Sequence, residues 1–381
     1  MARRAILILS ICAVLGLAAP PAQADDLSIC KDENAAADAA IDACTRIIKA
    51  GKIKGTDLAV TYYNRAISYR QKNDNDAALA DYGDSIKINP KYPMAFNGRG
   101  SIWKMRGEPD RAIADYSEAI KLDPKFALAY ANRGDAFDDK GDSERAIADL
   151  DQAIKLDPKL PRAYNTRGVV LLKKGHVDRA IADFTEAVRN DPKFVGAYTN
   201  RGEAWNDKGD HDRAIADLTE ALRIDPNYAR AYNIRGRTYR IRKDPTRALA
   251  DFTEAIRADP KYLAAYLNRG IAYSEQGDQD RAIADFTEAV RISPKLDAAY
   301  RNRAAVWLVK GDRLAALRDA DEAVSLDPND AANYFSRASV MRALSRNDDA
   351  ITDLRKALTL SPSESRKGQI EAALRELGAT P

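Results

Sequence analysis

The residues best suited to chemistry in this sequence are two cysteines and two histidines. Cys30 and Cys44 are separated by 14 residues, whereas redox-active pairs usually have the closer C-x-x-C spacing. His176 and His211 share no motif with each other or with the cysteines. The sequence also has no nucleophile elbow, zinc-protease helix, phosphate loop or dinucleotide fingerprint. We therefore expect no enzymatic activity and no cofactor, and a redox enzyme using Cys30 and Cys44 is the less favoured alternative.

The N-terminus predicts export. Two arginines precede an apolar run over residues 5–19, and Ala22 and Ala24 then form an A-x-A cleavage site. This order of features is typical of a secretory signal peptide, here residues 1–24. An uncleaved membrane anchor is the alternative. The expected location is the cell envelope, most simply a bacterial periplasm, or the exterior.

The charge balance favours no nucleic-acid partner. The chain has 60 Lys and Arg against 57 Asp and Glu, and two of the basic residues lie in the leader. The exported chain is thus nearly neutral, whereas nucleic-acid-binding proteins are usually basic. No later segment approaches the ~20 apolar residues that span a bilayer, so we expect no stable membrane insertion after cleavage.

In an oxidising compartment, the isolated pair Cys30 and Cys44 predicts one disulfide. Fourteen residues of continuous helix would separate the two by about 21 Å, which no disulfide spans. The chain must therefore bend between them, with Cys44 in a helix and Cys30 folded back against it. Closing this loop should stabilise an N-terminal cap by roughly 3 kcal/mol.

Prolines recur every 34 residues and divide most of the chain into nine units. They lie at positions 90, 124, 158, 192, 226, 260, 294, 328 and 362. If the proline is position 32 of each unit, the units begin at residues 59, 93, 127, 161, 195, 229, 263, 297 and 331. Apolar positions 4, 8 and 11 have helical spacing, as do 20, 21, 24, 27 and 28. Each unit therefore predicts two helices, joined by a K-G-D-like turn and ended by Asp-Pro.

These residues resemble the tetratricopeptide repeat. The match is an aromatic at position 4, Gly at 8, an aromatic at 11, Ala at 20, Ala at 27 and Pro at 32. It extends over nine units, residues 59–364. The resemblance implies an all-α, right-handed solenoid whose first helices line a concave face. Residues 25–58 should then form an N-terminal cap, and a helix within 363–381 should form the C-terminal cap, with Ser363 at its start and Gly378 just past its end.

Position 7 is Arg and position 23 is Asp in all nine units. In an antiparallel hairpin whose turn centres near position 15, facing positions sum to about 30, so these two residues should face each other. A partly buried arginine needs such a partner. We therefore predict a structural ion-pair ladder rather than a binding surface. Its members include Arg133 with Asp149, Arg201 with Asp217, and Arg269 with Asp285.

Family members usually contact ligands through positions 2, 5, 6, 9, 12 and 13, where this chain has a row of asparagines. Asn132, Asn200 and Asn268 occupy position 6, and Asn233 occupies position 5. Such amides can both donate to and accept from the backbone of an extended peptide. The alternative, weighed equally, is that they satisfy nearby backbone. The Lys/Asn/Arg clamp for terminal carboxylates is not reproduced, because no unit has Lys at position 5 or Arg at position 6.

The other candidate groove residues differ along the chain. Repeats three and five contribute acidic side chains, and repeats seven to nine are apolar there. The candidates are Arg237, Arg240, Leu267, Ile271, Leu308 and Phe335. Apolar groups gathered on one face favour a partner site, although some of them can instead pack against the next helix.

Taken together, these patterns predict a non-catalytic scaffold that binds a protein or peptide in the concave groove. A periplasmic chaperone or assembly factor for envelope proteins is the alternative within binding functions.

The redox alternative is testable by thiol titration. In the folded, oxidised, exported protein we expect neither Cys30 nor Cys44 to react with a thiol reagent, because the two form a disulfide. The control is the same titration after denaturation and reduction, which should reveal two thiols. Two reactive thiols in the native protein would instead favour the redox enzyme.

Overall fold

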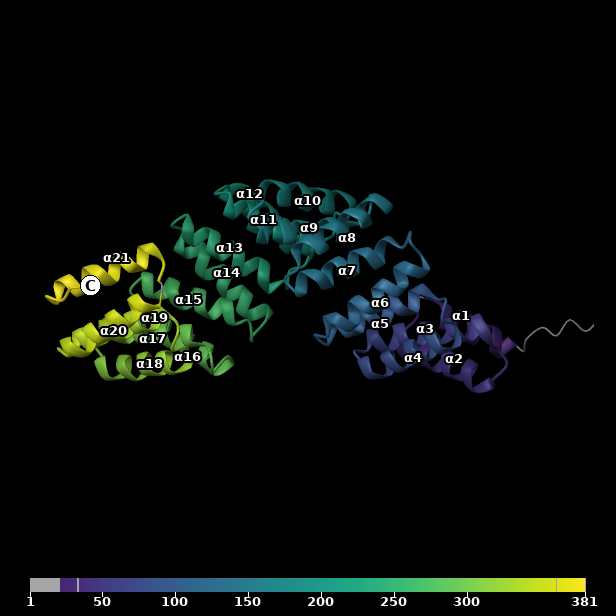
Figure 1. The fold of residues 1–381 in the computed structure, drawn as a ribbon, viewed down its shortest axis with the longest axis horizontal. Coiled ribbons are helices and arrows are strands. Elements are labelled where there is room, and N and C mark those ends of the chain that lie inside the picture. The colour runs from purple at the N-terminus through teal and green to yellow at the C-terminus, as the bar shows by residue number, and fades with distance from the viewer. Residues whose placement is uncertain (1–20, 33, 361, 381) are drawn as a thin grey trace, which may run out of the picture. The chain divides into compact units, whose positions relative to one another are not determined.

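A computed structural model describes residues 21–32, 34–360 and 362–380. This part of the chain is all-helical, without strands (Figure 1). Its helices are α1 (Pro21–Lys31), α2 (Ala37–Ala50), α3 (Gly55–Gln71), α4 (Asn75–Ile88), α5 (Pro93–Met105), α6 (Pro109–Leu122), α7 (Ala127–Asp139), α8 (Ser143–Leu156), α9 (Pro161–Lys173), α10 (Val177–Asn190), α11 (Val195–Asp207), α12 (His211–Ile224), α13 (Ala229–Ile241), α14 (Pro245–Ala258), α15 (Leu263–Glu275), α16 (Gln279–Ile292), α17 (Asp297–Lys310), α18 (Arg313–Leu326), α19 (Ala331–Ala343), α20 (Asn347–Thr359) and α21 (Glu364–Glu376). The all-α class predicted from the repeat is confirmed.

The helices fall into two compact units, and the boundary between Val170 and Leu171 lies within α9. Unit 1 contains repeats one to three, and unit 2 contains repeats five to nine. The signal-peptide prediction for residues 1–24 lies mostly outside the described residues. None of the described helices is both long and apolar enough to cross a membrane.

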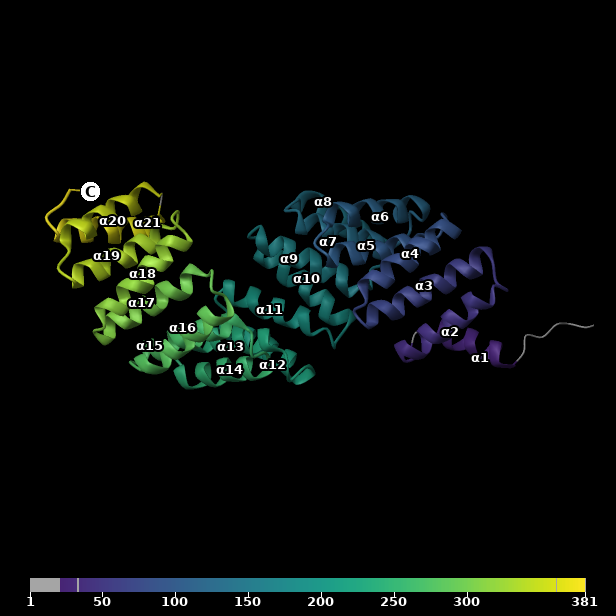
Figure 2. The ribbon, with the colours of Figure 1, turned by 90° about the horizontal axis from the view of Figure 1, so that it is seen from below.

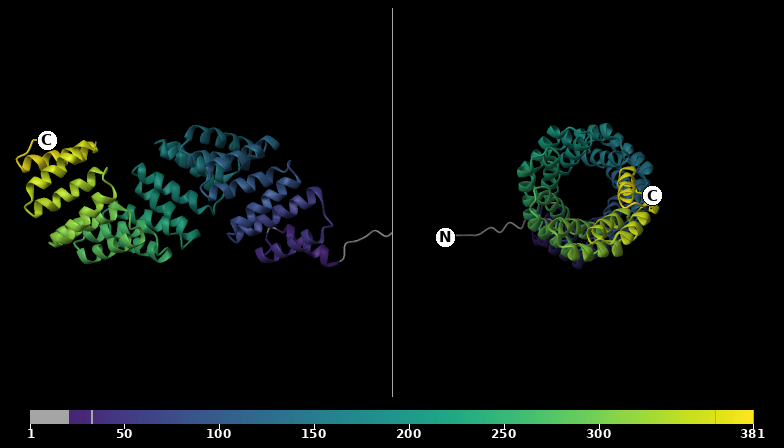
Figure 3. Two further views of the ribbon diagram at one scale, coloured as in Figure 1. Left: turned by 60° about the horizontal axis from the view of Figure 1, so that its bottom comes forward. Right: turned by 90° about the vertical axis from the view of Figure 1, so that its left-hand side faces the viewer.

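Within each unit, every helix packs on the next. In unit 2, α17, α18, α19 and α20 lie side by side in this order (Figure 2), and Figure 3 shows the same pairing of neighbours from other sides. The first helices of adjacent repeats also touch, as α11 does with α13, α13 with α15, and α17 with α19. They form a continuous surface of unit 2, which we call the first-helix face: α11, α13, α15, α17 and α19.

The turn inside each hairpin follows from its Gly-Asp pair. Gly209 has φ +83°, a left-handed conformation that side chains disfavour. Asp210 then accepts a hydrogen bond from the backbone N–H of Arg213 and so caps α12. Asp142, Asp244 and Asp278 cap the second helices of their repeats in the same way.

Close packing of the two helices explains the glycine at position 8. A Cβ added at Gly202 would lie 2.9 Å from Leu218 Cγ and 3.2 Å from the carbonyl oxygen of Ala214. The first helix therefore approaches the second to a distance that only glycine permits at this position. The fully buried Ala214 at position 20 keeps the other side of the contact small.

The Arg and Asp of the predicted ladder are in contact. In repeats one to three and five to nine, the Nε of Arg donates to one oxygen of Asp over 2.6 to 2.9 Å, and Nη2 donates to the other. The pairs are Arg65–Asp81, Arg99–Asp115, Arg133–Asp149, Arg201–Asp217, Arg235–Asp251, Arg269–Asp285, Arg303–Asp319 and Arg337–Asp353. The aspartates are buried, so the fork of two bonds compensates for lost hydration.

A third bond, which the spacing within one repeat does not predict, joins the ladder arginines of repeats five to nine to the preceding repeat. Nη1 of Arg201 donates to Thr185 at position 25 of repeat four over 3.2 Å. Arg235, Arg269 and Arg303 reach Thr219, Thr253 and Thr287 in the same way, and Arg337 reaches Asp321. The guanidinium also stacks on the aromatic at position 4, with Arg201 Cζ 5.5 Å from the ring centre of Tyr198. In repeats five to nine the ladder arginine therefore contacts two helices of its own repeat and one of its neighbour.

Both ends carry extra helices. The Sγ atoms of Cys30 in α1 and Cys44 in α2 lie at disulfide distance, 2.03 Å apart. These helices pack on α3, which begins at Gly55 and so extends four residues before the first repeat as numbered. At the other end, the Ser363 hydroxyl accepts from the N–H of Arg366 and caps α21, which packs on α20.

Removing one ladder carboxylate should be costly, because it leaves a half-buried arginine unpaired. For Asp217→Ala we expect a loss of about 3 kcal/mol in unfolding free energy, measured as a fall in the melting temperature. The matched control is Asp178→Ala, whose exposed pair with Lys208 should contribute less than about 1 kcal/mol. Equal melting temperatures for the two variants would contradict a structural role for the ladder.

Candidate partner-binding site

A pocket of about 270 Å³ opens on the first-helix face near the C-terminal end of unit 2. Its walls come from α17, α19 and α21. The lining residues are Arg301, Asn302, Ala305, Leu308, Ala332, Phe335, Ser336, Ser339, Val340 and Arg366. The structure thus brings together two of the predicted groove residues, Leu308 and Phe335, although they are 27 residues apart in the chain.

Helical spacing explains which residues reach the pocket. Arg301, Ala305 and Leu308 occupy positions 5, 9 and 12 of repeat eight, and Phe335 and Ser339 occupy positions 5 and 9 of repeat nine. Residues at these intervals share one face of a helix. Because α17 and α19 touch, the two rows lie next to each other and enclose an apolar floor.

The C-terminal cap helix places a cation at this floor. Arg366 in α21 lies with its Cζ 4.9 Å from the ring centre of Phe335, which is a cation–π contact. Its Nη1 donates to Gln369 over 3.0 Å, and no carboxylate among the described residues pairs with it. The repeat pattern gives no signal for Arg366, because it does not extend into α21.

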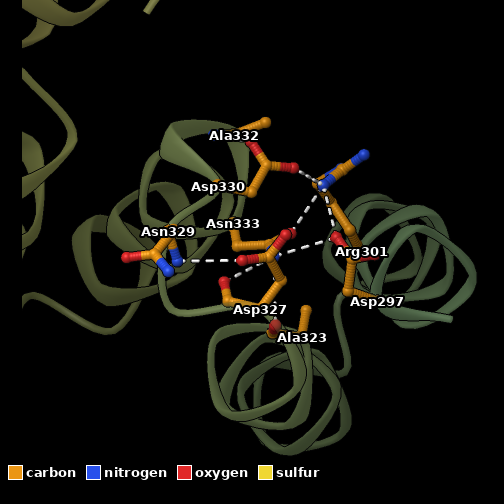
Figure 4. A network of polar contacts seen from close by, with 8 residues as sticks. All are labelled: Asp297, Arg301, Ala323, Asp327, Asn329, Asp330, Ala332 and Asn333. Carbon is orange, nitrogen blue, oxygen red and sulfur yellow. Dashed lines mark hydrogen bonds and ion pairs between the residues drawn. The ribbon is translucent and has the colours of Figure 1, made fainter. Parts of the chain in front are cut away.

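A polar network fixes the second pocket cation, Arg301 (Figure 4). One guanidinium nitrogen, Nη1, donates to Asp330 and Asn333 over 2.6 Å each and to Asp297 over 3.0 Å. Asn333 is fully buried and donates to Asp297 and to the carbonyl oxygens of Ala323 and Asp327. Figure 4 shows another nitrogen of Arg301 pointing away from these partners. The arginine is therefore held rigidly while part of its guanidinium faces the pocket.

This network was detectable as a set of departures from the repeat. Position 3 is Ala in repeats two to eight, whereas repeat nine has Asn333. Position 34 is aromatic or Leu in repeats one to seven, whereas repeat eight has Asp330. Arg301 is the only arginine at position 5. Each change alone is unremarkable in a surface helix, and only the structure shows that the three side chains meet.

The asparagines considered for the groove form hydrogen bonds with one another between neighbouring repeats. Nδ2 of Asn132 donates to Oδ1 of Asn97 over 2.9 Å, and Nδ2 of Asn268 donates to Oδ1 of Asn233 over the same distance. Asn132 and Asn233 are 3% and 4% exposed. Position 6 of one repeat thus bonds position 5 of the previous repeat, which accounts for the alternation in the sequence. Asn132, Asn233 and Asn268 thus connect first helices of neighbouring repeats.

Asn200 is likewise 7% exposed, and its Oδ1 accepts a bond from Nη1 of Arg230 over 2.8 Å. The same arginine forms an ion pair with Glu203 over 2.7 Å. Burial lowers the pKa of Arg230, but the Glu203 carboxylate outweighs this effect and raises it above its ordinary value. The amide of Asn200 is therefore part of a polar contact between repeats five and six.

The remaining predicted groove residues divide between surface and interior. Arg240 pairs with Glu275 over 2.7 Å, whereas Arg237 is exposed and 4.0 Å from Glu203. Leu267 and Ile271 are half-buried and pack against a core cluster that contains Phe286. Leu308 and Phe335 are also half-buried against core clusters, but these two line the pocket. Of the predicted set, Leu308 and Phe335 form the best-defined pocket.

Comparison with known proteins assigns the repeat to a family. Family models described as tetratricopeptide repeat match residues 165–229, 235–297, 308–365 and 59–92, and one described as TPR repeat matches 104–141 and 134–175. No protein in a search of curated sequences matches the chain.

Solved structures share the fold at low sequence identity. A tetratricopeptide repeat protein from Parabacteroides merdae is 22% identical with a TM-score of 0.52, and the match covers 66% of this chain and 98% of that one. The APC/C hetero-tetramer Cut9-Hcn1 is 15% identical with a TM-score of 0.55, covering 93% and 86%. The human IFIT1 dimer with m7Gppp-AAAA is 14% identical with a TM-score of 0.57, covering 93% and 90%. With the family models and the helix-pair packing, these matches show that the chain belongs to the tetratricopeptide-repeat proteins.

Proposed function

We propose that the protein is a non-catalytic scaffold of the cell envelope that binds an extended segment of a protein partner on the first-helix face of unit 2. The pocket between α17, α19 and α21 is the anchor of this site. The tetratricopeptide-repeat architecture supports a protein-interaction role in general. The pocket is the observation that supports this particular place, because it combines an apolar floor with polar groups at its rim.

The chemistry of the pocket indicates which partner group it accepts. Leu308, Phe335 and Val340 offer an apolar surface, and burying one apolar side chain there contributes about 1.5 to 3 kcal/mol. Arg366 and Arg301 are donors at the rim and have no acceptor capacity of their own. A segment with an apolar side chain beside a carboxylate or a backbone carbonyl satisfies both features.

Envelope location rests on the N-terminal leader in the sequence. The same scaffold serves a chaperone or assembly factor if it takes many weak clients instead of one partner. Burial of the two cysteines argues against the redox alternative. Cys30 and Cys44 are 4% and 0% exposed, so a substrate has little access to either sulfur atom.

A pull-down from envelope extract tests the site. We expect Leu308→Glu or Phe335→Glu to reduce capture of the partner at least tenfold, because each places a carboxylate on the apolar floor. Arg366→Glu tests the rim without changing the floor and should also weaken capture. Leu128→Glu is the matched control, since Leu128 is an exposed leucine on a first helix of unit 1.

Circular dichroism and the melting temperature of each variant show whether it is folded. Unchanged capture by both the Phe335→Glu and the Arg366→Glu variants would place the site elsewhere. Equal loss with Leu128→Glu would also contradict the proposal.

A further inference from the structure

Neighbouring repeats are linked by exposed ion pairs along the edge where the two helices of each hairpin are joined. The acidic partner is the second residue of a second helix, at position 18, and the basic partner ends the next first helix, at position 14. The links among the described residues are Asp76–Arg106, Asp110–Lys140, Asp178–Lys208, Asp212–Arg242 and Asp280–Lys310. Exposed ion pairs of this kind contribute little to the stability of the fold, but they keep this edge of the repeats charged.

The junction of repeats eight and nine has two leucines in place of this ion pair. Leu314 occupies position 18, and Leu344 occupies position 14 of the next repeat. Leu314 is 67% exposed, and Val309, on the other side of the same turn, is 70% exposed. Leu344 packs partly against the core cluster that also borders Trp307. At the junction of repeats six and seven the ion pair is also replaced, but by the polar residues Thr246 and Gln276. An apolar surface interrupts the charged edge at the junction of repeats eight and nine.

Repeat eight also lacks the arginine that covers the aromatic residue at position 11 in other repeats. In those repeats, Arg at position 19 stacks on this ring, with Cζ 4.3 to 4.6 Å from the ring centre. The pairs are Arg111–Trp103, Arg145–Phe137, Arg213–Trp205, Arg247–Tyr239 and Arg281–Tyr273. Repeat eight keeps the aromatic as Trp307 but has Ala315 at position 19, and the cation over this ring is Lys310, whose Nζ lies 5.5 Å from the ring centre.

An arginine is found instead at position 22, where the first seven repeats all have alanine. This residue, Arg318, is exposed on α18, as is Arg313 near the start of the helix. Neither guanidinium forms an ion pair with a carboxylate in the part of the chain that the structure describes. Two unpaired cations therefore share a helix with the exposed Leu314.

We propose that this region, which we call the repeat-eight edge (Trp307, Val309, Leu314, Leu344, Arg313 and Arg318), is a second protein-interaction surface. It docks an acidic amphipathic segment of a partner. Apolar side chains of that segment cover Leu314 and Val309, and its carboxylates pair with Arg313 and Arg318. This surface is distinct from the pocket, whose lining residues occupy positions 2, 5, 6, 9, 10 and 12 of the repeats or lie in α21.

The charges around the edge favour a protein segment over an anionic bilayer. The adjoining second helices carry exposed acidic residues at the same level, Asp280 in α16, which pairs with Lys310, and Asp348 in α20. A flat anionic surface meets the Asp348 carboxylate along with the two arginines, and like charges repel. A narrow segment seated on the first turns of α18 meets Arg313, Leu314 and Arg318 before it reaches the exposed acidic residues Asp321 and Glu322 of the same helix.

The test compares the native chain with a variant that restores the repeat pattern. Leu314→Asp restores the acidic residue that position 18 has at the ion-paired junctions, and because Leu314 is 67% exposed this variant should fold with an unchanged melting temperature. A random phage-displayed peptide library is selected on the native chain and counter-selected on this variant. We expect acidic peptides with apolar residues at helical spacing, which bind the native chain at least tenfold more tightly than the variant.

Two further variants separate this surface from the pocket and from bulk charge. Arg313→Glu with Arg318→Glu should abolish binding of the selected peptides, and Phe335→Glu should leave it unchanged. Loss of binding with Phe335→Glu would assign the peptides to the pocket and overturn the proposal. So would a selection without any discriminating peptide, or binding of the native chain alone to phosphatidylglycerol vesicles.

Discussion

The bidentate bond between Arg at position 7 and Asp at position 23 is the interaction on which the rest of the structure depends. A charge at position 7 is compatible with the interior only because the facing carboxylate accepts two of its hydrogen bonds. The third bond, from Nη1 to position 25 of the previous repeat, joins consecutive hairpins. One side chain thus sets the register within a repeat and between repeats. The same constraint removes the most regular residue of the chain from consideration as a binding residue.

Contacts within one hairpin could be predicted from the sequence, whereas contacts between hairpins could not. Arg201 and Asp217 face each other because their positions sum to the length of the hairpin, and this requires no knowledge of neighbouring repeats. Thr185 reaches Arg201, and Asn97 reaches Asn132, only through the stacking of one repeat on the next. Spacing along a single chain does not contain this stacking geometry. The two-repeat period of the asparagines was visible, but its physical cause was not.

The candidate pocket could be predicted only in part, because spacing along the chain does not show how one repeat, or the C-terminal cap, packs on its neighbour. Leu308 and Phe335 lie at positions that a helical repeat directs to one surface, so their shared location followed from periodicity. Arg366 belongs to α21, outside the repeat, and its place over Phe335 depends on how the cap packs. Leu267 and Ile271 are apolar first-helix residues that pack on the core around Phe286, as Leu308 and Phe335 pack on their own core clusters, but only Leu308 and Phe335 line the pocket. Residue type and position alone do not distinguish these cases.

In a strictly periodic chain, departures from the pattern carry the information that the pattern itself cannot. A repeat residue that stabilises every hairpin equally has no reason to differ at one junction, so a local change signals a local requirement. Repeats eight and nine collect such changes on two surfaces. Arg301, Asp330 and Asn333 replace an ordinary packing contact with a fully bonded polar network beside the pocket. Leu314 and Leu344 replace an ion pair with exposed and half-buried apolar groups on the edge. The first change keeps buried polar groups satisfied, whereas the second leaves Leu314 exposed while Leu344 packs partly against the core near Trp307. A partner that covers Leu314, as we propose, would account for that exchange.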